Sequence, residues 1–210
     1  MIRKSGMTAC LFFLPLTTFA ATRTYEVAAF EAVSAAAGVD VDITSGPSRS
    51  VVAETRAGDF EGLRISVQNN VLKIDRPSRG WFQFMRPGYT VHVVTPVLRA
   101  VTGSSGADIT VKGASSEAFT VDASSGSDIQ VEGLKAGNVK AHASSGSDLE
   151  LAGTCSTLEV EASSGSDVDA GSLRCDTATV RASSGSDVFV HASRSVTGNA
   201  SSGSDVKVRG

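Results

Sequence analysis

The chain has 210 residues, of which 41% are hydrophobic, and a formal net charge of −3 at pH 7. This length suits a single domain that buries its own core. Acidic residues outnumber basic residues over positions 101–210, which disfavours nucleic acid as a partner because phosphate binding requires a clustered basic face.

The first 20 residues have the composition of a secretory signal peptide. Arg3 and Lys4 are basic, "CLFFLPL" is an apolar core too short to span a bilayer, and small residues precede a cleavage point after Ala20. Cys10 comes before the apolar run instead of after it, which argues against a lipid anchor. The sequence therefore predicts an exported mature chain without a transmembrane segment, located in the periplasm, at the outer surface or in the medium.

Residues 21–100 contain stretches in which apolar and polar residues alternate, the pattern of half-buried strands. "VDVDIT" begins at Val39, "YTVHVV" begins at Tyr89, and "LRISVQNNVLKID" predicts a hairpin that turns at Asn69 and Asn70. The rest of the chain is repetitive, and a stack of repeats needs its ends covered. We therefore expect residues 21–100 to form a cap or a set of irregular first coils.

The segment "RGWFQFMRPG", residues 79–88, gathers large apolar side chains between two arginines. These side chains are Trp81, Phe82, Phe84 and Met85. If exposed, they would form an interaction loop for a protein or glycan partner. We favour the alternative, in which they plug the open end of the core.

Residues 101–210 repeat the string SSG(S/A)D at intervals of 18 to 20 residues. The copies end at Asp108, Asp128, Asp148, Asp167, Asp187 and Asp205. Alternating residues flank each copy, which indicates two short strands per repeat. In an antiparallel meander, equivalent turns would lie two strands apart and gain nothing from being alike, whereas in a parallel β-helix they stack at about 4.8 Å. The sequence therefore predicts an all-β protein, a parallel β-helix with about 20 residues per coil. Leucine-rich repeats share the period but need an LxxLxL pattern, which this chain lacks.

The small residues of the repeated turn have a physical explanation. A positive φ at the corner would strain a residue with a side chain, so each copy carries a glycine. These glycines are Gly106, Gly126, Gly146, Gly165, Gly185 and Gly203. We expect the aspartate of each copy to accept hydrogen bonds from turn amides, and the alanine before each turn to face a narrow part of the core.

Cys155 and Cys175 occupy the same position of the repeat, one coil apart. Stacked positions at about 4.8 Å lie within the Cα separation that a disulfide accepts, and export leads to an oxidising compartment. The sequence thus favours a disulfide between them. The alternative is two buried free thiols.

Three parts of the chain resemble the bacterial autotransporter-adhesin head GIN domain family, over roughly residues 25–208. They are "GVDVDITSGPSRSVVAE", "LRISVQNNVLKI" and the serial "SSGSD" turns. The family commonly has GSG where this chain has SSG, which leaves one glycine per corner. The resemblance implies export, a right-handed parallel β-helix and one domain over residues 21–210, with an irregular part (21–100) and a regular part (101–210). Adhesion is the activity that the family name implies.

One acidic patch is a candidate for chemistry. Asp148, Glu150, Asp167 and Asp169 should project from one face of adjacent coils. They could hold Ca²⁺, the one cofactor candidate, or serve a polysaccharide-acting enzyme. We favour a role as turn caps and solvated residues, because the aspartate recurs at every turn whereas an active site is singular. His92, His142 and His191 fall at unrelated positions of the repeat and do not suggest one ligand set.

The sequence favours a non-enzymatic, exported structural or binding module of the cell envelope. Outward residues offer a flat, ligand-facing column: Gln130, Glu150, Asp169, Phe189 and Lys207. The alternatives are a polysaccharide-acting β-helix that uses the acidic patch, and a periplasmic envelope accessory protein. Expected partners are an envelope protein, a glycan or a second copy of the chain.

Overall fold

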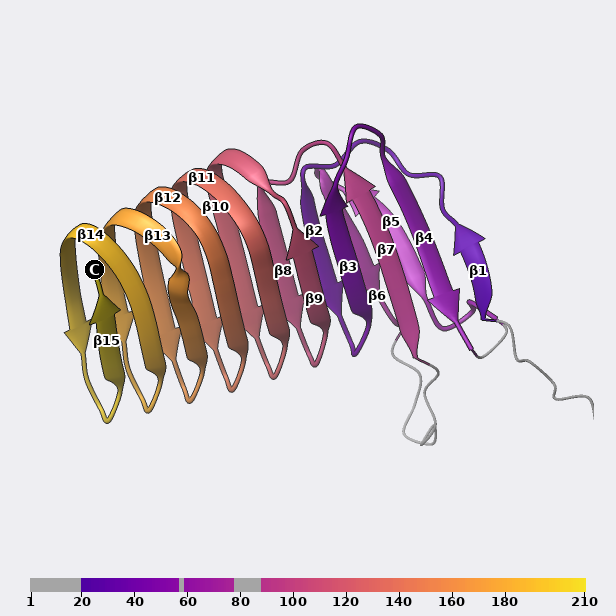
Figure 1. Ribbon diagram of the computed structural model, residues 1–210. Helices are drawn as coiled ribbons and strands as arrows, with labels where there is room; N and C mark the ends of the chain where they lie inside the picture. The colour runs from indigo at the N-terminus through magenta and orange to yellow at the C-terminus, as the bar shows by residue number, and fades with distance from the viewer. Residues whose placement is uncertain (1–19, 57–58, 78–87) are drawn as a thin grey trace, which may run out of the picture.

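The computed structural model describes residues 20–56, 59–77 and 88–210, and these form strands, turns and loops without a helix (Figure 1). The strands are β1 (Ala21–Thr24), β2 (Ala32–Ala36), β3 (Asp40–Ser45), β4 (Ser50–Thr55), β5 (Arg64–Gln68), β6 (Val71–Asp75), β7 (Tyr89–Thr95), β8 (Ala100–Ser104), β9 (Asp108–Lys112), β10 (Ser115–Ser124), β11 (Asp128–Ser144), β12 (Asp148–Ser163), β13 (Asp167–Ala182), β14 (Asp187–Ala200) and β15 (Asp205–Arg209). The described residues include no helix long and apolar enough to cross a membrane.

From β8 onward, the chain forms a stack of parallel coils (Figure 1). The long strands β11, β12, β13 and β14 bend from one side of the stack to the other, and each pairs in parallel with the next. The register places each repeat on its copy, with Asp128 beside Asp148 and Asp148 beside Asp167. The predicted parallel β-helix with about 20 residues per coil is confirmed.

The core is a set of apolar columns that run along the stack. Every second residue of a strand points inward, so equivalent residues of successive coils meet. One column contains Val121, Ala141, Val160 and Val180, each at most 2% exposed. A second column, on the other side of the turn, contains Ile129, Leu149, Val168 and Val188, each 2% exposed. The alternation in the sequence therefore corresponds to the inside and outside of the coil.

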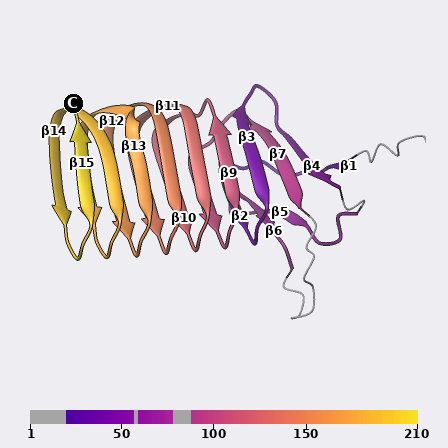
Figure 2. The ribbon, with the colours of Figure 1, turned by 60° about the horizontal axis from the view of Figure 1, so that its bottom comes forward.

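Each repeated turn places two consecutive residues in the left-handed region. The six predicted glycines have φ between 66° and 76°. The serine before each glycine has φ between 54° and 57°, which the sequence did not predict. Two left-handed residues in a row are typical of a type I′ turn. The turns align along one edge of the stack (Figure 2), where the Gly126 amide donates to the Ser145 carbonyl of the next coil at 3.2 Å.

The last serine of the repeated string forms a buried column. Ser127, Ser147, Ser166 and Ser186 are each 0% exposed. The Ser186 hydroxyl accepts a hydrogen bond from the Ser183 amide at 3.1 Å and donates one to the Ala162 carbonyl of the preceding coil at 3.1 Å. This serine therefore joins its own turn to the neighbouring coil, which explains why it recurs.

The structure contains one more copy of the turn, in "AAAGVD", residues 35–40. Ala37 and Gly38 have φ of 62° and 66°, and the Gly38 amide donates to the Ser105 carbonyl at 3.1 Å. The strands on either side, β2 and β3, pair in parallel with β8 and β9. Residues 21–100 therefore include a coil of the stack, whose turn lacks the serines and which an insertion separates from the other copies.

The insertion between β3 and β8 covers the N-terminal end of the stack (Figure 1). Strand β6 pairs in parallel with β2, and β7 pairs in parallel with β3, so they add one more layer. Strand β5 forms the predicted hairpin with β6, with Asn69 and Asn70 at φ of 53° and 61°. Strands β4 and β1 then pair antiparallel at the outer edge. Trp81, Phe82, Phe84 and Met85 lie outside the described residues.

Cys155 and Cys175 are directly paired in the β12–β13 register. The structure joins their Sγ atoms in a disulfide, with the Cα atoms 4.5 Å apart. Both side chains are buried in the core, where the bond ties two successive coils together.

Candidate functional site

Two outward columns define one side of the stack, which we call the aspartate face. The first column is Asp40, Asp108, Asp128, Asp148, Asp167, Asp187 and Asp205, and the second is Asp42, Thr110, Gln130, Glu150, Asp169, Phe189 and Lys207. From β9 onward the register places the members of each column on adjacent coils. The ligand-facing column expected from the sequence is the greater part of the second column.

The four acidic residues considered for chemistry lie together on this face. Asp148 is paired with Asp167, and Glu150 with Asp169. Three of them accept hydrogen bonds from the protein. The Asp187 amide donates to Asp167 Oδ1 at 3.3 Å, the Gly171 amide to Asp169 Oδ1 at 2.9 Å, and Gln130 Nε2 to Glu150 Oε2 at 3.2 Å. The hydrogen bond to Asp167 comes from the next coil and not from its own turn.

The carboxylates of the first column disfavour one another's charge. Burial raises the pKa of the Asp148 carboxyl above its ordinary value, and the neighbouring Asp128 and Asp167 raise it further. Burial also raises the pKa of Asp108, with a further contribution from Asp40. The pKa is raised at Asp108 and Asp148 for the same two reasons, burial and a neighbouring carboxylate, so it does not mark Asp148 as a single catalytic acid.

Within the described residues, no three histidine, cysteine, aspartate or glutamate side chains converge as a metal ligand set. Asp148, Glu150, Asp167 and Asp169 are neighbours on an open surface. His142 Nδ1 lies 4.0 Å from Glu161 Oε2, and His92 Nδ1 lies 3.2 Å from Asp42 Oδ2, so these histidines contact separate carboxylates.

Open grooves run between the two columns of the aspartate face. One is lined by the acidic patch together with Asp128 and Gln130, and its floor includes Ile129 and Leu149. Another, nearer the last coil, is lined by Phe189 and Lys207. The Phe189 ring lies against Gly171, where an added Cβ would come 2.6 Å from ring atom Cδ1. The grooves follow the stack and present carboxylates and one aromatic ring.

The opposite side of the stack carries charges that neutralise one another. Arg181 Nη1 donates to Glu159 Oε1 at 3.0 Å and to Glu161 Oε1 at 2.9 Å, and Lys140 Nζ lies 3.7 Å from Glu159 Oε2. The hydrogen bond from Arg181, followed by the charge of Lys140, lowers the pKa of Glu159. Acids and bases therefore occupy neighbouring coils here as matched pairs.

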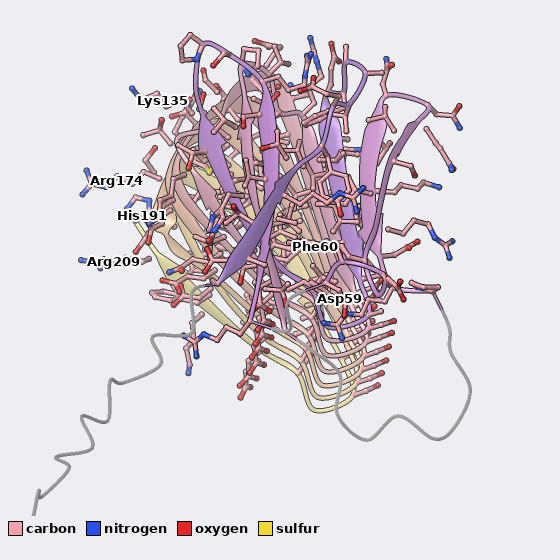
Figure 3. The ribbon with its side chains drawn as sticks, turned by 90° about the vertical axis from the view of Figure 1, so that its right-hand side faces the viewer. Asp59, Phe60, Lys135, Arg174, His191 and Arg209 are labelled. Atoms are coloured by element: carbon pink, nitrogen blue, oxygen red, sulfur yellow. A yellow bond between two sulfur atoms is a disulfide. The ribbon has the colours of Figure 1, made fainter. Side chains whose placement is uncertain are left out.

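A third set of outward residues lies beside the second column of the aspartate face. We call it the basic column: Lys135, Arg174, His191 and Arg209, with Thr154 between the first two. The register pairs each with the next, from Lys135 beside Thr154 to His191 beside Arg209. Figure 3, which looks along the stack, shows the four labelled side chains projecting from the same side.

The sequence analysis missed two features of these surfaces. Asp40 and Asp42 belong to the aspartate face, and the signal that could have found them is the Gly-x-Asp of residues 38–40. The basic column was missed because Arg174 and His191 are separated by 17 residues, whereas the turns of the same two coils, at Asp167 and Asp187, are separated by 20. Register shifts in the paired strands bring them into line, including one between Ala170 and Arg174.

Comparison with known proteins agrees with this architecture. The family described as "putative auto-transporter adhesin, head GIN domain" matches residues 29–210. A search of curated proteins found no match.

Three solved structures illustrate the similarity of fold. A "putative adhesin" from Bacteroides fragilis is 14% identical with a TM-score of 0.79, covering 91% of this chain and 97% of that chain. A "putative lipid binding protein" from Parabacteroides distasonis is 12% identical with a TM-score of 0.65, covering 92% of this chain and 98% of that chain. A "putative adhesin" from Parabacteroides merdae is 12% identical with a TM-score of 0.64, covering 92% and 98%.

At these identities the solved structures show the shared fold alone. The family match is stronger evidence of relationship, because it covers residues 29–210. This range includes the insertion and every repeated coil. The chain therefore belongs to the auto-transporter adhesin head GIN domain family.

Proposed function

We propose that this chain is an exported, non-enzymatic binding module of the cell envelope, which contributes to adhesion through the outer surfaces of its coil stack. The observation that carries the proposal is the register of the coils. It aligns outward side chains into long columns with grooves between them that are open along the stack. Surfaces of this kind suit an extended ligand that contacts several coils at once.

Membership of the family supports a role in adhesion, and the signal-like residues 1–20 support export. The descriptions of the solved relatives as adhesins agree with this role. In this proposal the coil stack is the scaffold and the varied outward residues determine what is bound, as is usual for repeat proteins.

The alternative function is an enzyme that acts on polysaccharides with Asp148, Glu150, Asp167 and Asp169. Catalysis by a carboxyl pair needs one acid and one base in distinct environments. Here the raised pKa of Asp148 has the same origin as that of Asp108, and both side chains are exposed. This uniformity favours the binding function over the enzymatic one.

Binding and catalysis can be separated in one experiment. Residues 21–210 are labelled with a fluorescent dye and incubated with bacterial envelopes and with a glycan array. Each bound glycan is then assayed for new reducing ends and unsaturated products. The proposal predicts retention without product. Product that disappears in the Asp148→Asn or Asp169→Asn variant would establish the enzyme instead, and absence of binding to every envelope and glycan would remove the adhesion role.

The Ca²⁺ alternative is tested by thermal unfolding of the same protein with and without EDTA, followed by titration with Ca²⁺. Hydrogen bonds from amides to Asp167 and Asp169 can hold these side chains without a cation, so we expect the same melting temperature in both conditions. A lower melting temperature in EDTA that Ca²⁺ restores would assign a metal to the aspartate face.

A further inference from the structure

We propose that the basic column, Lys135, Arg174, His191 and Arg209 with Thr154, is the binding site for a linear anionic polysaccharide that lies along the stack. This proposal rests on the proposed binding function and deepens it by naming the class of ligand. It assigns recognition to a surface other than the aspartate face.

The first argument is that these cations form no ion pair within the part of the chain that the structure describes. Lys135, Arg174 and Arg209 make no ion pair with the described residues, which leaves three exposed positive charges aligned on one side. Arg181, on the same strand as Arg174, bonds two glutamates. Lys135, Arg174 and Arg209 lie on alternate coils, about 10 Å apart, so each positive charge repels the next one weakly. An anionic ligand would remove this repulsion.

The second argument is that the column does not follow from overall composition. The chain has a net charge of −3, and acidic residues predominate in its repeated part. Nevertheless, β11, β13, β14 and β15 each contribute a basic residue to this column. A basic line within an acidic protein creates a local positive potential that would steer anions to one place.

The third argument concerns the shape of the ligand. The column is one residue wide and runs perpendicular to the strands, so a ligand must be narrow and extended to contact several members. The aspartate face begins two residues away in the last two coils, where Phe189 precedes His191 and Lys207 precedes Arg209. In β11 and β13 it ends five residues before Lys135 and Arg174. A broad polyanion such as duplex nucleic acid would also cover the carboxylates and be repelled. A single polysaccharide chain is narrow enough to lie on the basic column without covering the carboxylates.

The chemistry of the side chains fits acidic sugars. A guanidinium binds a carboxylate or sulfate with two parallel hydrogen bonds, and Arg174 and Arg209 provide two such groups. The Thr154 hydroxyl, between Lys135 and Arg174, can bond a sugar hydroxyl. His191 is half-buried and its Nδ1 is buried without a hydrogen-bond partner, so the ring is held against the coil between the two arginines.

Calorimetry with two forms of one oligosaccharide tests the proposal. The probe is an oligogalacturonate, which carries one carboxylate per sugar, and the control ligand is its methyl ester. We expect the acidic form to bind, the ester to bind at least tenfold more weakly, and the affinity to fall as salt is added. Loss of one charge-assisted hydrogen-bonding group by Arg174→Ala should weaken binding about tenfold, and Lys135→Ala should weaken it to a similar extent.

Arg181→Ala is the matched control, because it removes the same charge from another exposed site on the same strand. Equal weakening by Arg174→Ala and Arg181→Ala would show a general effect of net charge and overturn the site. Equal affinity for the ester would overturn the role of charge, and stronger binding of single-stranded DNA would overturn the choice of a polysaccharide.

The same variants distinguish this proposal from the proposed function. If Arg174→Ala and Lys135→Ala bind envelopes as the unmodified chain does, the basic column is not the site but the chain remains a binding module. If the unmodified chain binds neither envelopes nor any glycan, the binding function itself fails. Circular dichroism of each variant checks that the fold is retained.

Discussion

The buried serine column can be tested at Ser186. The change is Ser186→Ala, which removes a hydroxyl from a site that is 0% exposed. Two hydrogen bonds are lost, one accepted from the Ser183 amide and one donated to the Ala162 carbonyl. Neither backbone group is left unpaired, because the Ser183 amide also donates to the Ala162 carbonyl at 3.0 Å. The cost is therefore the net value of two hydrogen bonds, about 2 kcal/mol, without the larger penalty for a buried orphan group.

The assay is equilibrium unfolding in guanidinium chloride followed by circular dichroism. The midpoint should fall at an unchanged slope, which shows that stability has changed and not the surface exposed on unfolding. Ser156→Ala is the control, since Ser156 is exposed and lies on a neighbouring coil. The reciprocal change Ala107→Ser adds the hydroxyl to a buried position of the first repeated coil, where we expect a gain of about 1 kcal/mol.

The reasoning is refuted if Ser186→Ala lowers the free energy of unfolding by less than about 0.5 kcal/mol, the usual range of a neutral surface substitution. An equal effect of Ser156→Ala would refute it too. In either case the serine would recur for a reason other than its link between coils.

Three further predictions concern the covalent bond, the turns and the aspartate face. Replacing Cys155 and Cys175 with serine should lower the free energy of unfolding by about 3 kcal/mol, because the disulfide closes a loop with a sequence separation of 20; a reductant should shift the midpoint of the unmodified chain and leave the variant unchanged. Ser125 and Gly126 both have a left-handed backbone conformation, which favours glycine. Ser125→Gly should therefore stabilise the protein by up to about 1 kcal/mol, and Gly126→Ala should destabilise it by about 1 kcal/mol or more. Guanidinium midpoints that move in the opposite directions would contradict this. Asp148→Asn should stabilise the protein at neutral pH, because a raised pKa in the folded state penalises the charged carboxyl above its ordinary value of 3.8. That advantage should disappear in melts below about pH 3, where the carboxyl is largely protonated in both states, and an advantage independent of pH would contradict it.

Much of the fold could be predicted because residues at equivalent positions of the sequence repeat also contact one another in the structure. In a parallel stack, each residue contacts the equivalent residue of the next coil, so a period of about 20 residues also gives the strand register. Ala123 and Ala143, expected to face the core, are both 0% exposed for this reason. The pairing of Cys155 with Cys175 follows from the same rule.

The predictions were incomplete where the chain departs from the period. The coil formed by β2 and β3 stacks on β8 and β9, although residues 46–99 lie between them in the sequence. Its turn keeps Gly38, which the backbone requires, but replaces serines with Ala36, Ala37 and Val39. The hydrogen bonds of the serines are thus not essential to every coil, and a search for repeated serines overlooks this one.

The sequence by itself determined the class of fold, the positions of the turns and the inward and outward faces of each strand, because these depend on local backbone preferences and on an alternation that every coil repeats. Only the tertiary structure decided which charges meet across coils. The register shifts between Ala170 and Arg174 in β13, and between Val131 and Leu134 in β11, move the following residues relative to the turn. Residues at unequal intervals, such as Arg174 and His191, thereby come side by side, and the chain acquires a basic column that its composition and its period do not reveal.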